Sequence, residues 1–136
     1  MKEIDLDELF ALAFKAADFA YAPYSKFRVG AALLADDGTV FSGCNVENRS
    51  FGLTICAERN AVVTAVGAGR RSFLALAVST PDSDYPVAPC GACRQVLSEF
   101  MLPASPVIFG GSKGEKVKTT IGILYPFDSL HELGEC

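Results

Sequence analysis

The chain has 136 residues, of which 50% are hydrophobic and 21% charged, and a net charge of −4. One core fills a chain of this length, so we expect a single domain covering residues 1–136. The longest run of basic residues is Arg70-Arg71, which argues against nucleic acids and anionic membrane surfaces as partners. The acidic start is unlike a secretion signal, and no apolar stretch is long enough for a membrane helix, so we expect a cytoplasmic protein.

The first third of the chain predicts a helix followed by a β-hairpin. Apolar residues recur at helical spacing from Asp5 to Tyr21, and Pro23 ends this helix. Residues 27–34 and 39–46 have the pattern of two strands joined by the tight turn Asp36-Asp37-Gly38.

The rest of the chain alternates helices with apolar strands. Helical spacing predicts helices over residues 56–66 and 90–101, the second closed by Pro103. Strands are expected over residues 72–79, 106–109 and 117–124, and a terminal helical turn over 129–133. This order predicts an α/β fold with three layers, α/β/α, around a mixed five-stranded sheet.

The sequence contains five cysteines and a single histidine, His131. In a reducing compartment, thiols are more often metal ligands, nucleophiles or core residues than disulfides. A mechanism that needs a histidine base or a histidine-rich metal site must use His131 or be set aside.

Three of the cysteines lie where a loop passes into a predicted helix, in Cys56-Ala57-Glu58 and in Pro89-Cys90-Gly91-Ala92-Cys93. The partial positive charge of a helix N-terminus favours the thiolate, which is the form that binds metals. Three thiolates on Zn²⁺ leave one tetrahedral position open, as a catalytic zinc site requires. We therefore expect one zinc ion per chain on Cys56, Cys90 and Cys93, with Glu58 placed to handle protons on water at the metal.

Three thiolates outweigh the charge of Zn²⁺ and weaken its Lewis acidity, so a positive group has to offset them. Two helix N-termini contribute partial charge. Arg59 could donate a hydrogen bond to a ligand sulfur, and Arg94 could share that role; the sequence leaves both open.

Two other interpretations of the cysteines compete with an open zinc site. Cys90-Gly91-Ala92-Cys93 at a helix start also resembles a dithiol redox motif. Cys44 could complete a structural site with four cysteines, although its place in an apolar strand favours an ordinary buried thiol.

Four segments resemble the small homotetrameric cytidine deaminases, and the resemblance covers nearly the whole chain. The segments are Ala22-Pro23-Tyr24-Ser25-Lys26-Phe27, Gly43-Cys44-Asn45-Val46-Glu47-Asn48, Cys56-Ala57-Glu58-Arg59 and Pro89-Cys90-Gly91-Ala92-Cys93-Arg94-Gln95-Val96. A Cys-x-Glu followed by Pro-Cys-x-x-Cys is the all-cysteine variant of the zinc deaminase pattern.

The resemblance implies roles for the matching residues. The three cysteines would bind zinc, and Glu58 would be the general acid and base. Phe27 would stack on the base, and the Ala57 N–H would meet the pyrimidine carbonyl. Asn45 and Glu47 would hold the ribose hydroxyls.

Two aromatic residues bear on the assembly that the resemblance implies. Phe127 is the best match for the aromatic residue that reaches a neighbouring subunit's site in the family. Phe51 stands where relatives commonly have tyrosine, so a hydrogen bond from that position to a partner subunit is not expected. The apolar composition and the small-residue face of Ala57, Ala61 and Ala65 also favour a homotetramer.

The implied reaction is the hydrolytic deamination of free cytidine and deoxycytidine. Deaminases of aminoacyl-nucleoside antibiotics and of nucleotides share the zinc motif and remain alternatives. The segments that contain Phe27, Asn45 and Glu47 favour a plain nucleoside.

Overall fold

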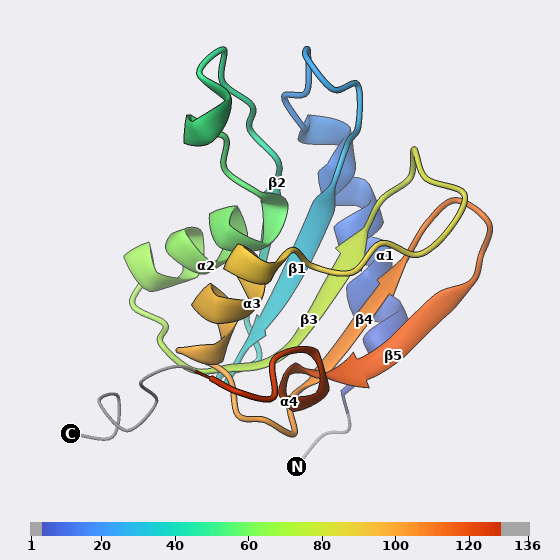
Figure 1. Ribbon diagram of the computed structural model, residues 1–136. Coiled ribbons are helices and arrows are strands. Elements are labelled where there is room, and N and C mark those ends of the chain that lie inside the picture. The colour runs from blue at the N-terminus through green and yellow to red at the C-terminus, as the bar shows by residue number, and fades with distance from the viewer. Residues whose placement is uncertain (1–3, 129–136) are drawn as a thin grey trace.

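The computed structural model of the chain describes residues 4–128, built around one mixed sheet (Figure 1). The strand order is β2-β1-β3-β4-β5. β3 and β4 pair in parallel, and the other neighbouring strands pair antiparallel. The strands are β1 (Gly30–Ala35), β2 (Val40–Cys44), β3 (Phe73–Ser79), β4 (Pro106–Gly110) and β5 (Lys116–Thr120).

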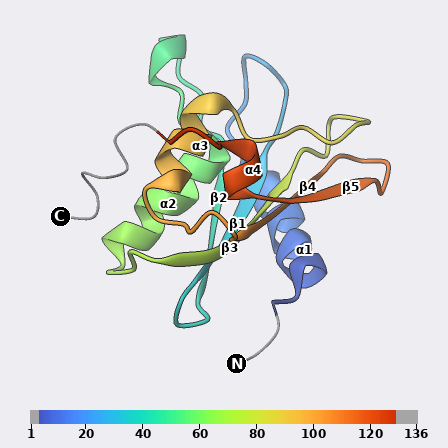
Figure 2. The ribbon, with the colours of Figure 1, turned by 60° about the horizontal axis from the view of Figure 1, so that its bottom comes forward.

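Helices cover both faces of the sheet, which confirms the predicted three layers. Figures 1 and 2 show α1 on one face and α2 and α3 on the other. The α-helices are α1 (Leu6–Ala16), α2 (Ala57–Gly67), α3 (Gly91–Ser98) and α4 (Ile121–Leu124), and short 3-10 turns form η1 (Ala17–Phe19) and η2 (Phe51–Leu53). None of the helices in the described part of the chain has the length and apolarity of a membrane span.

Each face of the sheet has its own buried apolar cluster. On the α1 side, Leu9 and Phe10 pack against Ala75 and Ile108. On the α2 and α3 side, the cluster includes Leu33, Leu76, Val78, Val107, Leu97 and Val62. Each fully buried leucine or valine contributes about 1.5–3 kcal/mol relative to an exposed one. Burial on both faces of the sheet agrees with the near-continuous apolar sequence of the central strands.

Several boundaries differ from the predicted ones, for local reasons. The predicted strand over 117–124 is wrong in its second half, because β5 ends at Thr120 and α4 begins at Ile121. Thr120 caps that helix by accepting a hydrogen bond from the Ile123 N–H at 3.3 Å. The predicted strand over 27–34 begins only at Gly30. The terminal turn predicted over 129–133 lies outside the described residues.

The three alanines of α2 contradict the subunit-contact role predicted for them. Ala57, Ala61 and Ala65 are fully buried within the chain, in the cluster between α2 and the sheet. Their small size allows the helix to approach the strands closely, so they are not available to another subunit. Val63 is 60% exposed on the same helix.

Candidate active site

Three thiols meet where α2 and α3 begin, and Figure 1 shows these two helices next to each other on one face of the sheet. Cys56 and Cys90 are the N-cap residues of α2 and α3, and Cys93 lies in the first turn of α3. The Cys90 and Cys93 sulfurs are 3.4 Å apart, and the Cys56 and Cys90 sulfurs 4.0 Å. All three sulfurs lie within 4.8 Å of one another.

This donor set fits zinc. Tetrahedral coordination with Zn–S bonds of about 2.3 Å places ligand sulfurs roughly 3.8 Å apart, which is close to the observed spacing. Within residues 4–128, this is the group of three or more potential ligand residues that could hold a metal ion, and Cys44 is not part of it. Three donors match an open site better than a closed structural one.

The backbone supports negative charge at the same place. Neither Cys56 nor Cys90 uses its side chain to cap its helix, so the first N–H groups of both helices keep their hydrogen-bonding capacity. Ala57, whose N–H is one of them, is fully buried. The two helix N-termini add partial positive charge beside the sulfurs.

Of the two arginines that the sequence offered as donors to a ligand sulfur, Arg59 makes the contact. Its Nη2 donates to Cys56 Sγ at 3.1 Å, whereas Arg94 donates to the carbonyl oxygens of Pro89 and Leu124. A hydrogen bond from Cys93, assisted by Arg59, lowers the pKa of Cys56 to about 5. The hydrogen bond to Cys56 raises the pKa of Arg59 above its ordinary value. The guanidinium is therefore placed to offset thiolate charge.

Glu58 is a buried carboxylic acid next to the thiol cluster. Only 4% of its surface is exposed. Burial raises its pKa to about 7, and the negative charge of Cys56 acts in the same direction. A carboxyl group that is neither fully ionised nor fully protonated near neutral pH can both accept and deliver a proton.

A cavity of about 190 Å³ opens beside these groups. Several of the residues singled out in the sequence line this cavity, including Phe27, the candidate for stacking on the base. Its lining consists of Phe27, Val29, Asn45, Thr54, Cys56, Ala57, Glu58, Val78, Thr80, Val87, Ala88 and Cys90. The volume is below the roughly 300–1,000 Å³ of sites that enclose a whole drug-sized ligand, so it suits only the reacting part of a substrate.

Asn45 and Glu47 hold the backbone beside the cavity. The Asn45 side chain accepts from the Val29 N–H at 2.9 Å and donates to the Phe27 carbonyl at 2.8 Å. The Glu47 carboxylate accepts from the Ser25 hydroxyl and from the N–H groups of Tyr24 and Ser25. The hydrogen bond from the Ser25 hydroxyl lowers the pKa of Glu47, which keeps it ionised. Glu47 is not among the residues that line the cavity.

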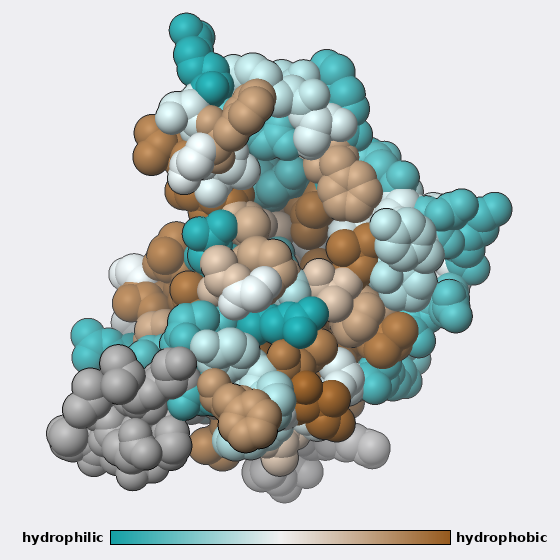
Figure 3. All heavy atoms as spheres, viewed as in Figure 1, coloured by the Kyte–Doolittle hydropathy of each residue, from teal (hydrophilic) through white to brown (hydrophobic). Residues whose placement is uncertain are grey.

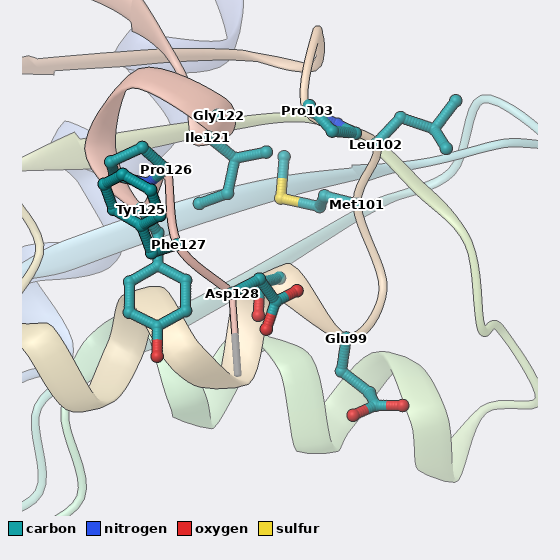
Figure 4. Close-up of a pocket in the computed structure, with 11 residues that line it drawn as sticks. Glu99, Met101, Leu102, Pro103, Ile121, Gly122, Tyr125, Pro126, Phe127 and Asp128 are labelled. Carbon is teal, nitrogen blue, oxygen red and sulfur yellow. The ribbon is translucent and has the colours of Figure 1, made fainter. Parts of the chain in front are cut away.

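Phe127 lies away from the thiol cavity of its own chain. It lines a larger hollow of about 770 Å³ at the other end of α3, together with Met101, Ile121 and Tyr125 (Figure 4). The lining of that hollow contains none of the clustered thiols, so the smaller cavity is the better candidate for chemistry. With 90% of its surface exposed, Phe127 is available to a neighbouring molecule.

A polar link at the cavity wall has no signal in the sequence. Arg28, between Phe27 and Val29, forms an ion pair of 2.8 Å with Asp82 in the loop after β3. The two residues are 54 positions apart in the sequence. Nothing in the sequence indicated that this loop meets the segment before β1.

Comparison with known proteins fits this geometry. A family model described as the cytidine and deoxycytidylate deaminase zinc-binding region matches residues 4–110. The chain belongs to this family. Zn²⁺ is accordingly its cofactor, and the three-thiol group is the place in the described chain that could hold it.

Relatives within the deaminase family are similar over most of their length. A cytidine deaminase from Sporosarcina psychrophila is 52% identical over 123 residues, which cover 90% of each chain. One from Halalkalibacterium halodurans is 46% identical and matches 90% of this chain and 92% of its own. The crystal structure of cytidine deaminase from Burkholderia pseudomallei has a TM-score of 0.87 and 46% identity, covering 92% of this chain and 99% of that one. The α/β fold is therefore that of cytidine deaminase structures.

Proposed function

We propose that the protein hydrolyses free cytidine and deoxycytidine to uridine and deoxyuridine with release of ammonia. The observation that carries the proposal is the convergence of Cys56, Cys90, Glu58 and Phe27 on one cavity, beside a third thiol that completes a zinc donor set. The named activities of the most similar relatives support the same substrate.

In this proposal, Cys56, Cys90 and Cys93 hold one zinc ion as thiolates. The ion supplies Lewis acidity, which makes water a competent nucleophile at neutral pH. Arg59 donates to Cys56 Sγ and reduces the negative charge that the thiolates would otherwise place on the site.

Glu58 moves the protons. Its carboxylate takes a proton from the attacking water and delivers it to N3 of the pyrimidine, which makes C4 more electrophilic. The water oxygen, now a hydroxide, forms a bond to C4 and gives a tetrahedral carbon. The same carboxyl group then moves the proton of the new C4 hydroxyl to the amino group, and the C4–N bond breaks, releasing ammonia and leaving the C4 carbonyl of uridine. The buried position of Glu58 beside Ala57 keeps the carboxyl group close to both reacting atoms.

The remaining residues orient the nucleoside. The Phe27 ring stacks on the base, and the Ala57 N–H donates to the pyrimidine carbonyl. Asn45 and Glu47 retain hydrogen-bonding capacity beyond their backbone contacts, since an amide has a second N–H and a carboxylate has further lone pairs. We assign these groups to the ribose hydroxyls.

We further propose a cytoplasmic homotetramer in pyrimidine salvage, with one domain spanning residues 1–136. The small cavity leaves most of a nucleoside uncovered, and Phe127 of a neighbouring subunit is the candidate to cover it. Figure 3 shows apolar side chains on the excursion between β2 and α2, where Phe51 is 72% and Leu53 67% exposed. Such exposed apolar groups favour burial against another subunit.

Deamination of cytidine, deoxycytidine and an aminoacyl-nucleoside antibiotic by the zinc-loaded protein, followed by ultraviolet absorbance, tests the substrate. We expect turnover of the two plain nucleosides. Turnover of the antibiotic alone would assign the alternative substrate class, and a zinc-loaded protein inactive on all three would refute the proposal.

Glu58→Gln tests the mechanism in the same assay. This variant should keep its zinc and its fold, but lose more than the roughly 10²–10⁴-fold that one proton-transfer step contributes, because the same group serves several transfers. Near-normal turnover would show that Glu58 does not move the protons.

A further inference from the structure

The cavity wall that contains Phe27 is not part of the sheet. β1 begins at Gly30, so Phe27, Arg28 and Val29 precede it. Lys26, immediately before Phe27, has a φ of 61°, a conformation that residues other than glycine seldom adopt. A strained turn persists only where its surroundings hold it.

Side chains, rather than a neighbouring strand, satisfy the three N–H groups of this wall. Phe27 N–H donates to Ser25 Oγ at 3.0 Å, Arg28 N–H to Asp82 Oδ2 at 2.9 Å, and Val29 N–H to Asn45 Oδ1 at 2.9 Å. Ser25 is held by Glu47. Of these three contacts, only the one with Asp82 ties the wall to the loop after β3.

Asp82 holds Arg28 by its side chain as well as by its backbone. The Arg28 guanidinium donates from Nε to Oδ2 at 3.0 Å and from Nη2 to Oδ1 at 2.8 Å. This forked arrangement fixes direction as well as distance. Phe27 and Val29, the neighbours of Arg28 in the sequence, both line the cavity. Thr80, just before the loop that carries Asp82, lines it as well. The pair thus joins two sides of one cavity.

We propose that Asp82 is a positioning residue for substrate binding, which acts through Arg28 to hold the Phe27 ring at the orientation that the base requires. The inference deepens the proposed deamination and rests on it for its kinetic effect. Asp82 does not touch the substrate. Its contribution is the geometry of the wall on which the base stacks.

The chain offers a matched control for the loss of an Arg–Asp pair. Arg70 Nε donates to Asp37 Oδ2 at 2.7 Å, and Asp37 also accepts from a backbone N–H, that of Thr39. The side chains of this pair are 35% and 42% exposed, compared with 41% and 28% for Arg28 and Asp82. Neither Asp37 nor Arg70 lines the cavity, so Asp37→Asn removes a similar pair without disturbing the wall.

Steady-state kinetics with cytidine should separate positioning from general stability. We expect Asp82→Asn to raise KM by about 3- to 30-fold, below the roughly 100-fold that a 1 Å displacement can cost, with kcat and zinc content little changed. Asp37→Asn should leave KM unchanged. Arg28→Lys keeps the backbone contact but loses the fork, so its KM should lie between the wild-type value and that of Asp82→Asn.

Amide hydrogen exchange of the substrate-free protein gives a readout that does not depend on activity. The Phe27 and Val29 amides should exchange faster in Asp82→Asn than in Asp37→Asn. Unchanged exchange at these two amides, an unchanged KM, or an equal rise of KM in both variants would overturn the inference. A wild-type protein inactive on cytidine would instead refute the proposed function, while the exchange data would still decide whether Asp82 holds the wall.

Discussion

Gly43 of β2 lies against the first residue of α2, and the contact leaves no room for a side chain. A Cβ atom at Gly43 would lie 2.5 Å from the carbonyl oxygen of Ala57 and 2.6 Å from the backbone nitrogen of Ala61. Both neighbours are backbone atoms, which cannot rotate away as a side chain can. The glycine therefore sets how closely the helix that carries Glu58 approaches the sheet, and where Cys56 lies relative to the other two thiols.

Replacing this glycine should loosen the metal centre. Gly43→Ala is expected to destabilise the fold by about 1–3 kcal/mol, as overpacking of a tight contact does, and to weaken zinc binding because Cys56 moves with α2. Thermal denaturation and metal titration measure the two effects. Gly67→Ala, at the open end of the same helix with no atom near the added Cβ, should change neither. Full zinc affinity in Gly43→Ala would show that the thiols adjust independently of the helix.

Cys44→Ser should retain one zinc ion per chain. The Cys44 thiol is outside the three-thiol group, and burial raises its pKa, which opposes the thiolate form that a ligand needs. Cys93→Ser should lower zinc binding strongly, because it removes a donor. Metal analysis of the two purified variants compares them directly, and loss of zinc from Cys44→Ser would support a closed site with four cysteines.

The sequence predicted the elements well where the pattern is local and periodic. The apolar stretches predicted as strands form β3 and β4. The cysteines predicted to lie at helix starts lie at the N-terminal ends of α2 and α3. The thiol cluster could be anticipated, since a helix start favours thiolates whatever the tertiary fold.

Contacts between distant segments could not be anticipated in the same way. The small face of α2 was expected to form a subunit contact, but it packs against the sheet. A face of small residues suits a strand or another subunit equally well, so the sequence could not distinguish the two. The pairing of Arg28 with Asp82 depends on how the loop after β3 returns to the segment before β1. For β5, the sequence pattern was equally compatible with a longer strand. Thr120 ends the strand by capping α4, but in the sequence it looks like any threonine within a strand.

The Arg28–Asp82 pair should give stability a distinct dependence on pH. Its hydrogen bonds lower the pKa of Asp82 in the folded protein, so this carboxylate stabilises the fold above its unfolded pKa of about 3.9. The contribution is lost as pH falls through the lower, folded value. Chemical denaturation at several pH values should therefore show Asp82→Asn less stable than the wild type at neutral pH, with the gap closing below about pH 4. A gap that persists unchanged into acid would exclude this linkage.

Active sites shared between subunits should complement one another. We expect a tetramer by light scattering, and reduced kcat/KM in Phe127→Ala because a neighbour's site loses its aromatic cover. Mixed tetramers of Phe127→Ala and Glu58→Gln should be more active than the sum of the separate variants, since some sites then combine an intact Glu58 with an intact Phe127. A fully active monomer, or mixtures without any gain, would contradict the shared site.

Nucleoside 5′-monophosphates should be poor substrates. None of the residues lining the cavity in the described part of the chain is basic, and Glu47 is held ionised nearby by the hydrogen bonds that lower its pKa. A phosphate dianion placed there would be repelled by this carboxylate, on which Lys26 is the positive charge that acts, and the chain as a whole carries a charge of −4. We expect kcat/KM for deoxycytidine to exceed that for its 5′-monophosphate at least about tenfold, which corresponds to about 1.4 kcal/mol of discrimination. Because exposed charges are screened by salt, the ratio should narrow as ionic strength rises. Equal efficiency on the two substrates at low salt would mean that the sugar end of the site lies away from Glu47.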